Sequence, residues 1–110
     1  MPDAGDVIWI QFPGAVATKR RPAIVLSSNE YHAARPDVIV GLVTSQIAKA
    51  TAATDHVLSD WRSVGLHSPS AFRAFLATLP KTAIISRVGR LSALDWQAVA
   101  QCLRRAITLP

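Results

Sequence analysis

The chain has 110 residues, of which 50% are hydrophobic and 17% charged, with 12 Lys and Arg against 7 Asp and Glu. This length suits one domain over residues 1–110, and the composition excludes a disordered basic tail. The net charge of +5 is uneven, because residues 1–60 carry five basic and six acidic side chains (−1) and residues 61–110 carry seven basic and one acidic (+6). The basic second half predicts a polyanionic partner, either a nucleic acid or an acidic protein.

The cysteine content and the hydropathy of the sequence favour a particular cellular compartment, the cytoplasm. A single cysteine, Cys102, excludes an intrachain disulfide and is typical of a reducing cytoplasm. No apolar run approaches the roughly 18 residues of a membrane-spanning helix, and the acidic residues 1–6 lack the features of a signal peptide. We therefore expect a cytoplasmic protein without membrane contacts.

The first half of the chain is predicted to form short strands. Runs rich in β-branched and other apolar residues favour strands over 6–12, 23–27, 38–44 and, as a short edge strand, 55–58. A Pro-Gly turn signal follows the first run, and polar stretches predict loops over 15–21 and 28–37. Gly41 lies inside the third strand, which indicates a bend or a close backbone approach.

The second half predicts a further strand and one long helix. Residues 65–69 read as a turn, 70–79 as a strand or hairpin arm, and 82–88 as either a short helix or a strand. Ser92 is the expected N-cap of the C-terminal helix, with Asp95 three residues on, as in a capping box. Apolar side chains cover most of this helix, which predicts that part of it packs on another chain. The pattern is mainly β (α+β), and we expect a small, strongly bent antiparallel barrel with a C-terminal helix.

Most signatures of catalytic chemistry are absent from the sequence. The three histidines, at positions 32, 56 and 67, lack the spacing of metal ligands, so we expect no metal and no cofactor. There is no Gly-rich phosphate loop and no nucleophile elbow. Cys102 falls on the apolar side of the predicted helix and is expected to be a buried structural thiol.

Three consecutive cations, Lys19, Arg20 and Arg21, directly precede Pro22. They fit a solvated loop, but proline restricts Arg21 to an extended conformation, so that its side chain projects from a defined place beside the sheet. An arginine held in this way can offer a planar, bidentate fork to a phosphate. Thr44 is the last residue of the third predicted strand. Either its hydroxyl faces the same edge of the sheet as Arg21, or the residue only ends the strand.

Several segments carry a family resemblance. Residues 5–9 (GDVIW) and 21–27 (RPAIVLS) look like a GD[IV]xW…RPxxVxS start, and 38–46 (VIVGLVTSQ) looks like a third-strand segment that ends in T[SA]Q. Further matches follow in the same order at 55–57 (DHV), 65–66, 69–70, 78, 81 and 89–92. Each match is weak alone, but together they span residues 5–92. The sequence therefore resembles the MazF/PemK family of type II toxin–antitoxin endoribonucleases.

The resemblance implies a homodimer of SH3-like barrels that cleaves single-stranded mRNA at short recognition sequences without a metal, leaving a 2′,3′-cyclic phosphate and a 5′-hydroxyl. It assigns Arg21 as the catalytic arginine, which would stabilise the transition state, and Thr44 as the catalytic threonine. It also implies a cognate antitoxin, an acidic and partly disordered chain. The residues expected to bind RNA around the catalytic pair are Lys19, Arg20, Ser45, Gln46, Ser70, Arg73 and Lys81.

The sequence departs from the family pattern in two places. The loop 13–20 is short and lacks the Glu-Gln-Gly type of insert that many relatives carry, which predicts altered cleavage-site specificity and weak turnover. Phe72 and Phe75 lie at odd spacing, so that in a strand they face opposite sides. One is expected in the core, and the other in the core, in a dimer interface or as a base-stacking platform.

Two other functions stay open at this point. One is a non-catalytic, CcdB-like gyrase poison on the same fold, although such poisons depend on the C-terminal end of the helix, where residues 108–110 offer no match. The other is a basic nucleic-acid-binding module, which would bind RNA in a salt-sensitive manner and leave it intact.

Overall fold

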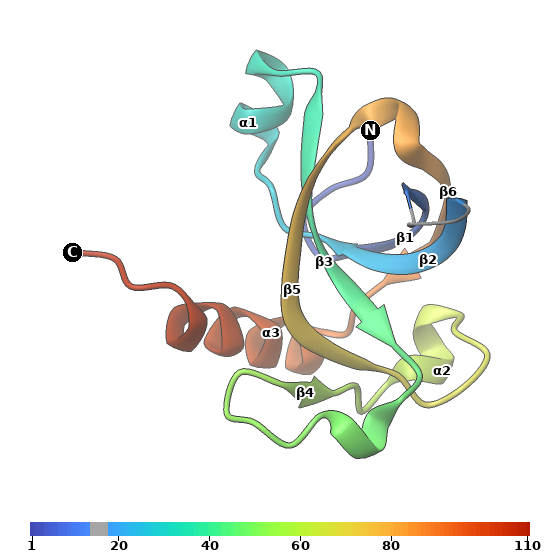
Figure 1. Ribbon diagram of the computed structural model, residues 1–110, viewed down its shortest axis with the longest axis vertical. Coiled ribbons are helices and arrows are strands. Elements are labelled where there is room, and N and C mark those ends of the chain that lie inside the picture. The colour runs from blue at the N-terminus through green and yellow to red at the C-terminus, as the bar shows by residue number, and fades with distance from the viewer. Residues whose placement is uncertain (14–17) are drawn as a thin grey trace.

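A computed structural model describes residues 1–13 and 18–110 (Figure 1). Six antiparallel strands form one sheet in the order β4-β5-β3-β2-β1-β6. The strands are β1 (Asp6–Pro13), β2 (Thr18–Val25), β3 (Asp37–Thr44), β4 (His56–Val57), β5 (Ala71–Pro80) and β6 (Ile84–Arg90). The helices are α1 (Asn29–Ala34), α2 (Trp61–Val64) and α3 (Ala93–Ala106), with short 3-10 turns η1 (Ile47–Lys49) and η2 (Lys81–Ala83).

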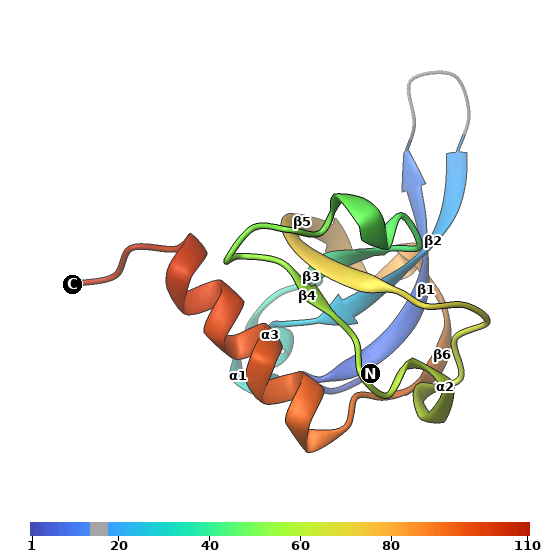
Figure 2. The ribbon, with the colours of Figure 1, turned by 90° about the horizontal axis from the view of Figure 1, so that it is seen from below.

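The sheet is strongly curved, as both ribbon views show (Figures 1 and 2). The long strand β5 lies between β4 and β3 in the sheet. Helix α3 packs against β5 and β4 on the side away from the β1–β2 hairpin. This confirms the predicted mainly β fold with a C-terminal helix. Because β4 and β6 lie at the two edges, the described strands form a curled half-barrel.

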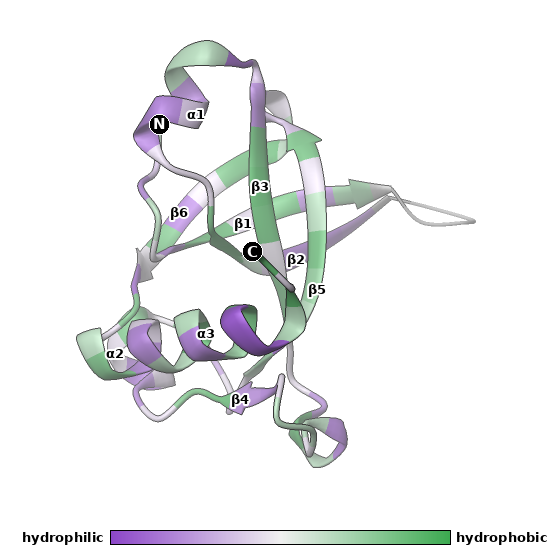
Figure 3. Cartoon of the chain, turned by 90° about the vertical axis from the view of Figure 1, so that its left-hand side faces the viewer, coloured by the Kyte–Doolittle hydropathy of each residue, from purple (hydrophilic) through white to green (hydrophobic). Residues whose placement is uncertain are grey.

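Two hydrophobic clusters cover the two faces of the sheet, as expected from the alternation of side chains along a strand. Val7 and Ile24 belong to the cluster under α3, whereas their neighbours Ile8 and Val25 belong to the cluster inside the curl. Hydrophobic residues of β3 and β5 also contribute to these clusters, and Figure 3 shows the hydrophobic stretches of both strands. Cys102 is buried in the cluster under α3, and burial raises the pKa of its thiol, so it is the structural thiol that the sequence predicted.

Two predicted loops contain secondary structure. Residues 18–21, expected in a loop, belong to β2, where Arg21 is paired with Ile10 of β1; the rest of that predicted loop, residues 15–17, lies outside the described residues. The predicted loop 28–37 contains α1, whose N-cap Ser28 accepts a hydrogen bond from the Tyr31 amide. Residues 82–88, predicted as either a short helix or a strand, lie mostly in the strand β6.

The start of α3 confirms half of the predicted capping box. The Ser92 side chain accepts a hydrogen bond from the Asp95 amide, as expected. The Asp95 carboxylate does not return to Ser92 but accepts hydrogen bonds from the Ser59 and Asp60 amides, both at 2.9 Å, and contacts His56 Nε2 at 2.8 Å. Asp95 therefore fastens α3 to the segment before α2.

The exposed face of α3 is partly apolar. Leu94 is 65% exposed and Ile107, just beyond the helix, is 42% exposed, while the last turn carries Arg104 and Arg105. This agrees with the apolar excess seen in the sequence. Within the described ranges, no helix combines the length and apolar character needed to cross a membrane.

Candidate RNA-binding and catalytic pocket

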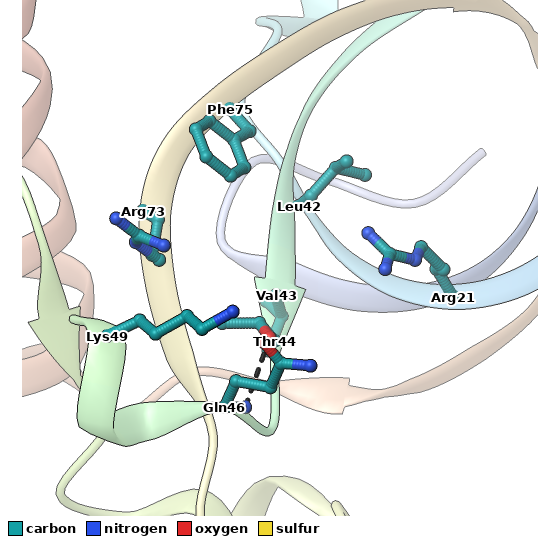
Figure 4. Close-up of a pocket in the computed structure, with 8 residues that line it drawn as sticks. All are labelled: Arg21, Leu42, Val43, Thr44, Gln46, Lys49, Arg73 and Phe75. Carbon is teal, nitrogen blue, oxygen red and sulfur yellow. Dashed lines mark hydrogen bonds between the residues drawn. The ribbon is translucent and has the colours of Figure 1, made fainter.

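A pocket of about 240 Å³ opens at the junction of β2, β3 and β5 (Figure 4). Its lining combines cations, one hydroxyl, one amide and apolar side chains. These residues are Arg21, Leu42, Val43, Thr44, Gln46, Lys49, Arg73 and Phe75. Four of the residues predicted from the sequence, two catalytic and two RNA-binding, thus line one pocket although they come from three separate segments.

Arg21 enters the pocket from β2. It lies opposite Ile10 in the β1–β2 hairpin, and the following Pro22 lies opposite Trp9, so the backbone around Arg21 is extended as the proline rule predicts. The side chain is exposed, and among the described residues no carboxylate lies within salt-bridge distance of it. Its guanidinium is therefore available to an anion in the pocket (Figure 4).

Thr44 lies at the end of β3, where the chain turns toward η1. Its Oγ1 accepts a hydrogen bond from the Gln46 amide at 3.1 Å, a local turn typical of Ser and Thr. This bond fixes the position of the hydroxyl oxygen and leaves its hydrogen free to donate. The exposed side chain of Gln46 lines the same pocket, whereas its exposed neighbour Ser45 does not.

Two further cations complete the pocket. Lys49, at the end of η1, extends across it toward Thr44 (Figure 4). Arg73, on β5, is held by the buried carboxylate of Asp55 at 3.4 Å and lies with its guanidinium carbon 5.3 Å from the centre of the Phe75 ring. The pocket thus gathers three positive charges, two of which have no carboxylate partner among the described side chains.

The other residues predicted to bind RNA lie elsewhere. Lys19 and Arg20 are exposed on β2, and Arg20 borders a separate hollow beside Trp9. Ser70 is 4% exposed and donates its hydroxyl to the Ser68 carbonyl. Lys81 donates to the His32 carbonyl at 2.6 Å, which attaches η2 to α1. For Ser70 and Lys81 these bonds give structural explanations that need no RNA contact.

Sequence reasoning missed Lys49 as a pocket residue. It lies three residues after Gln46 in a stretch rich in Ala and Thr, and only the turn η1 brings it back over the end of β3. No motif marks such a position. Phe75 was identified as an unusual aromatic, but its place beside Arg73 depends on a local distortion of β5 described below.

Outside the pocket, the buried carboxylates of Asp6 and Asp95 are held by hydrogen bonds and basic side chains. Asp6 contacts Arg87 at 3.2 Å and Arg90 at 3.3 Å; burial alone would raise its pKa, but these hydrogen bonds and charges lower the pKa below the usual value. The pKa of Asp95 is likewise lowered, because its bonds to His56 and two amides outweigh the effect of burial. Both carboxylates are therefore charged at neutral pH and hold the fold together.

The arrangement suits an anionic, phosphate-bearing ligand. Arginine can bind two phosphate oxygens at once, and the lysine and the threonine hydroxyl supply further donors. The pocket lining contains no His, Asp or Glu, and the part of the chain that the structure describes has no group of three or more His, Cys, Asp or Glu able to hold a metal ion. Charge stabilisation is thus the chemistry that these side chains offer.

One known protein family matches almost the whole chain. The family described as "PemK-like, MazF-like toxin of type II toxin-antitoxin system" matches residues 3–107. No protein of curated function matches the sequence significantly.

Solved structures share the fold at low sequence identity. An endoribonuclease in complex with its cognate antitoxin from a mycobacterial species has a TM-score of 0.83 and 21% identity, covering 100% of this chain and 98% of that one. The Mycobacterium tuberculosis toxin MazF-mt6 has a TM-score of 0.74 and 22% identity, over 92% and 94% of the two chains. The MazE–MazF structure (Form-II) from Deinococcus radiodurans gives 0.75 and 22%, over 99% and 97%.

Proposed function

The chain belongs to the PemK-like, MazF-like toxins of type II toxin–antitoxin systems, and on this basis we propose that it is an endoribonuclease that cleaves single-stranded mRNA at short recognition sequences and so stops translation and growth. The observation that carries the proposal is the pocket in which Arg21 and Thr44 face one space together with Lys49 and Arg73. Two of these cations, Arg21 and Lys49, have no carboxylate partner among the described residues, and together with a hydroxyl donor they suit a phosphodiester.

The proposed reaction is an internal transfer at phosphorus. The ribose 2′-oxygen attacks the adjacent phosphorus as its proton passes to solvent water, and the bond from phosphorus to the 5′-oxygen breaks. The 5′-oxygen takes a proton from water, so that the products carry a 2′,3′-cyclic phosphate and a 5′-hydroxyl. Negative charge grows on the non-bridging oxygens as the new bond forms. Arg21 meets this charge with two directed N–H donors, the kind of preorganised stabilisation that is often the largest catalytic contribution.

Thr44 and Gln46 hold the scissile group in this scheme. Thr44 donates its free hydroxyl hydrogen to a non-bridging oxygen, since its oxygen already accepts from the Gln46 amide. The Gln46 side chain reads a base edge or holds the RNA backbone near the cut. Because a guanidinium stays protonated in proteins, Arg21 stabilises charge and is a poor proton acceptor for the 2′-hydroxyl.

The reaction is proposed to need no metal ion. In two-metal and Mg²⁺-dependent nucleases, bound cations neutralise the developing charge and are held by carboxylates. Here the pocket lining supplies positive charge from its own side chains and has no carboxylate. We therefore expect cleavage to persist when divalent ions are chelated.

We further propose a homodimer and an acidic, partly disordered antitoxin as protein partners. Support for the antitoxin comes from α3, where Leu94 is exposed in the first turn, Arg104 and Arg105 lie in the last turn, and Ile107 is exposed just beyond it. Apolar contacts with flanking positive charge suit an acidic chain that folds as it binds. An endoribonuclease of the same fold has been solved with its cognate antitoxin.

The test is cleavage of mixed-sequence single-stranded RNA in EDTA, with the product ends mapped. The wild-type protein is expected to leave cyclic-phosphate and 5′-hydroxyl ends. Arg21→Ala should slow cleavage by about 10²–10³-fold, the typical cost of losing one transition-state donor. Arg87→Ala is the matched control, because Arg87 is equally a strand arginine but is paired with Asp6. Unchanged cleavage by Arg21→Ala, or a requirement for Mg²⁺, would contradict the proposal.

A further inference from the structure

The two phenylalanines of β5 have opposite environments. Phe72 is fully buried in the cluster under α3, whereas Phe75 is 56% exposed and lines the pocket with Arg21 and Thr44. Burial in the core explains the aromatic side chain of Phe72. An aromatic ring left open to solvent inside a cationic pocket has no such explanation.

A bulge in β5 sets the position of Phe75. Between Phe72 and Leu76 the chain takes four steps, while the paired strand β3 takes two, from Val43 to Gly41. The extra residues include Ala74, whose φ of 57° lies in the left-handed region that disfavours residues other than glycine. Such strained positions cluster at functional sites, and bulges redirect side chains next to them.

At the bulge, three consecutive residues alternate between the pocket and the core. Ala74 packs against the cluster under α3, and the residues on either side of it, Arg73 and Phe75, both line the pocket. Figure 4 labels both side chains where they line the pocket along β5. The strained residue thus presents a cation and an aromatic ring together.

The Phe75 ring is also held by its neighbour. The Arg73 guanidinium carbon lies 5.3 Å from the ring centre, and Arg73 is itself held by the Asp55 carboxylate, whose side chain is only 3% exposed. A ring supported in this way loses little freedom when a flat ligand stacks on it.

We propose that Phe75 is a stacking platform for one nucleobase beside the phosphate held by Arg21 and Thr44. The inference rests on the proposed ribonuclease function and extends it to a base-binding subsite. A nucleotide combines a flat aromatic face with a negative charge, and the pocket combines an open ring with Arg21, Lys49 and Arg73. An apolar protein partner has other exposed residues to contact, Leu94 and Ile107 at α3, outside this pocket.

Stacking of this kind is tolerant of sequence, because every base has a π-face. Phe75 is therefore expected to supply affinity for the RNA rather than a choice between bases. Its loss should weaken binding of different sequences by similar factors.

The experiment measures affinity separately from cleavage. A single-stranded RNA cleaved by the wild-type protein is prepared with 2′-fluoro substitutions, which remove the attacking hydroxyl, and its binding is followed by fluorescence anisotropy. Phe75→Leu should bind about 5- to 150-fold more weakly, the usual effect of losing one base–aromatic stack. Phe75→Trp should restore wild-type affinity. Leu94→Ala, another exposed apolar residue, should bind normally.

Four outcomes decide the proposal and the function on which it rests. Wild-type affinity in Phe75→Leu overturns it, as does equal weakening in Phe75→Leu and Phe75→Trp, which would indicate pocket shape rather than stacking. A change of oligomeric state in Phe75→Leu with unchanged RNA affinity also overturns it and assigns the ring to a protein interface. If the wild-type protein cleaves no RNA, binding is measured with 2′-fluoro versions of the mixed-sequence RNAs. Weaker binding by Phe75→Leu, with normal binding by Phe75→Trp and Leu94→Ala, then supports the stacking subsite and contradicts the proposed ribonuclease function.

Discussion

The pocket between β3 and β5 and the corner where β1 meets β6 both gather basic side chains, but they treat charge differently. In the corner, Arg87 and Arg90 converge on the buried Asp6 carboxylate. In the pocket, Arg21 and Lys49 face the open space without a carboxylate partner among the described residues. Paired charges stabilise the fold, whereas unpaired charges are available to a ligand.

This difference changes the meaning of the charge distribution along the sequence. The second half sums to +6, yet Arg87 and Arg90 are engaged by Asp6, and Arg73 is engaged by Asp55. Arg21 and Lys49, the pocket cations without a carboxylate partner in the part of the chain that the structure describes, come from the half that sums to −1. Net charge indicates the class of partner, but the pairing of individual side chains indicates where that partner binds.

Removing a buried, fully bonded carboxylate is expected to have the largest effect. Asp95→Ala should lower the free energy of unfolding by about 3–5 kcal/mol, because it leaves two amides and His56 without their partner. Urea unfolding followed by circular dichroism measures the loss. Glu30→Ala, at an exposed acidic residue, is the control and should change stability by no more than about 0.5 kcal/mol. Equal effects in the two variants would contradict the role given to Asp95.

The pocket hydroxyl should affect catalysis rather than stability. Thr44→Val keeps the side-chain shape but removes the donor, and cleavage should slow by about 10- to 100-fold, the cost of a hydrogen bond to a charged group. Thr44→Ser retains the hydroxyl and should keep most of the activity. The readout is the initial rate on one RNA, with thermal unfolding as a check of the fold. A Thr44→Val protein as fast as Thr44→Ser would remove Thr44 from the mechanism.

Acid should lower the free energy of unfolding in two stages. Burial and the nearby Lys81 charge lower the pKa of His32 below 6.5, so the unfolded chain binds a proton more readily and stability falls as the pH drops below that value. The pKa values of Asp6 and Asp95 are lowered below 3.8, so their contribution is complete above that pH and is lost as the pH falls through the folded-state values. Urea midpoints from neutral pH to about pH 3 test this order. Stability that stays constant or rises over this range would contradict it.

The smallest expected effect is on the salt dependence of RNA binding. Lys49→Ala removes one proposed phosphate contact and should reduce the slope of log affinity against log salt by about 0.7. Arg87→Ala should leave the slope unchanged, since Asp6 already holds that arginine. Anisotropy titrations with the 2′-fluoro RNA at several salt concentrations give both slopes. A larger change for Arg87 than for Lys49 would reverse the comparison between pocket and corner.

Much of the fold was predictable because its signals are local. β-branched runs predicted β1 and β3, and Ser92 predicted the start of α3, since strand propensity and capping depend on neighbouring residues. The partners of Asp95 were not predictable, because Ser59 and Asp60 lie more than 30 residues away and only the packing of α3 brings them together.

The candidate site was predictable where it follows a motif and not where it follows a turn or a bulge. Arg21 and Thr44 lie in segments that resemble the family, and the structure brings them to one pocket. Lys49 reaches the pocket through η1, and Phe75 through the bulge at Ala74, which no sequence rule predicts for a non-glycine residue. Lys81 also matches the family in sequence order, but its side chain donates a hydrogen bond to α1 and does not line the pocket.

The most direct test of the account is to map the RNA on the protein. Amide chemical shifts of the labelled chain are recorded by NMR while the uncleavable 2′-fluoro RNA is added. Shifts should concentrate around Arg21, Thr44, Gln46 and Phe75 and be small around Asp6 and Arg87, because the unpaired charges of the pocket bind the phosphates. Shifts centred on the β1–β6 corner, with the pocket unchanged, would contradict it.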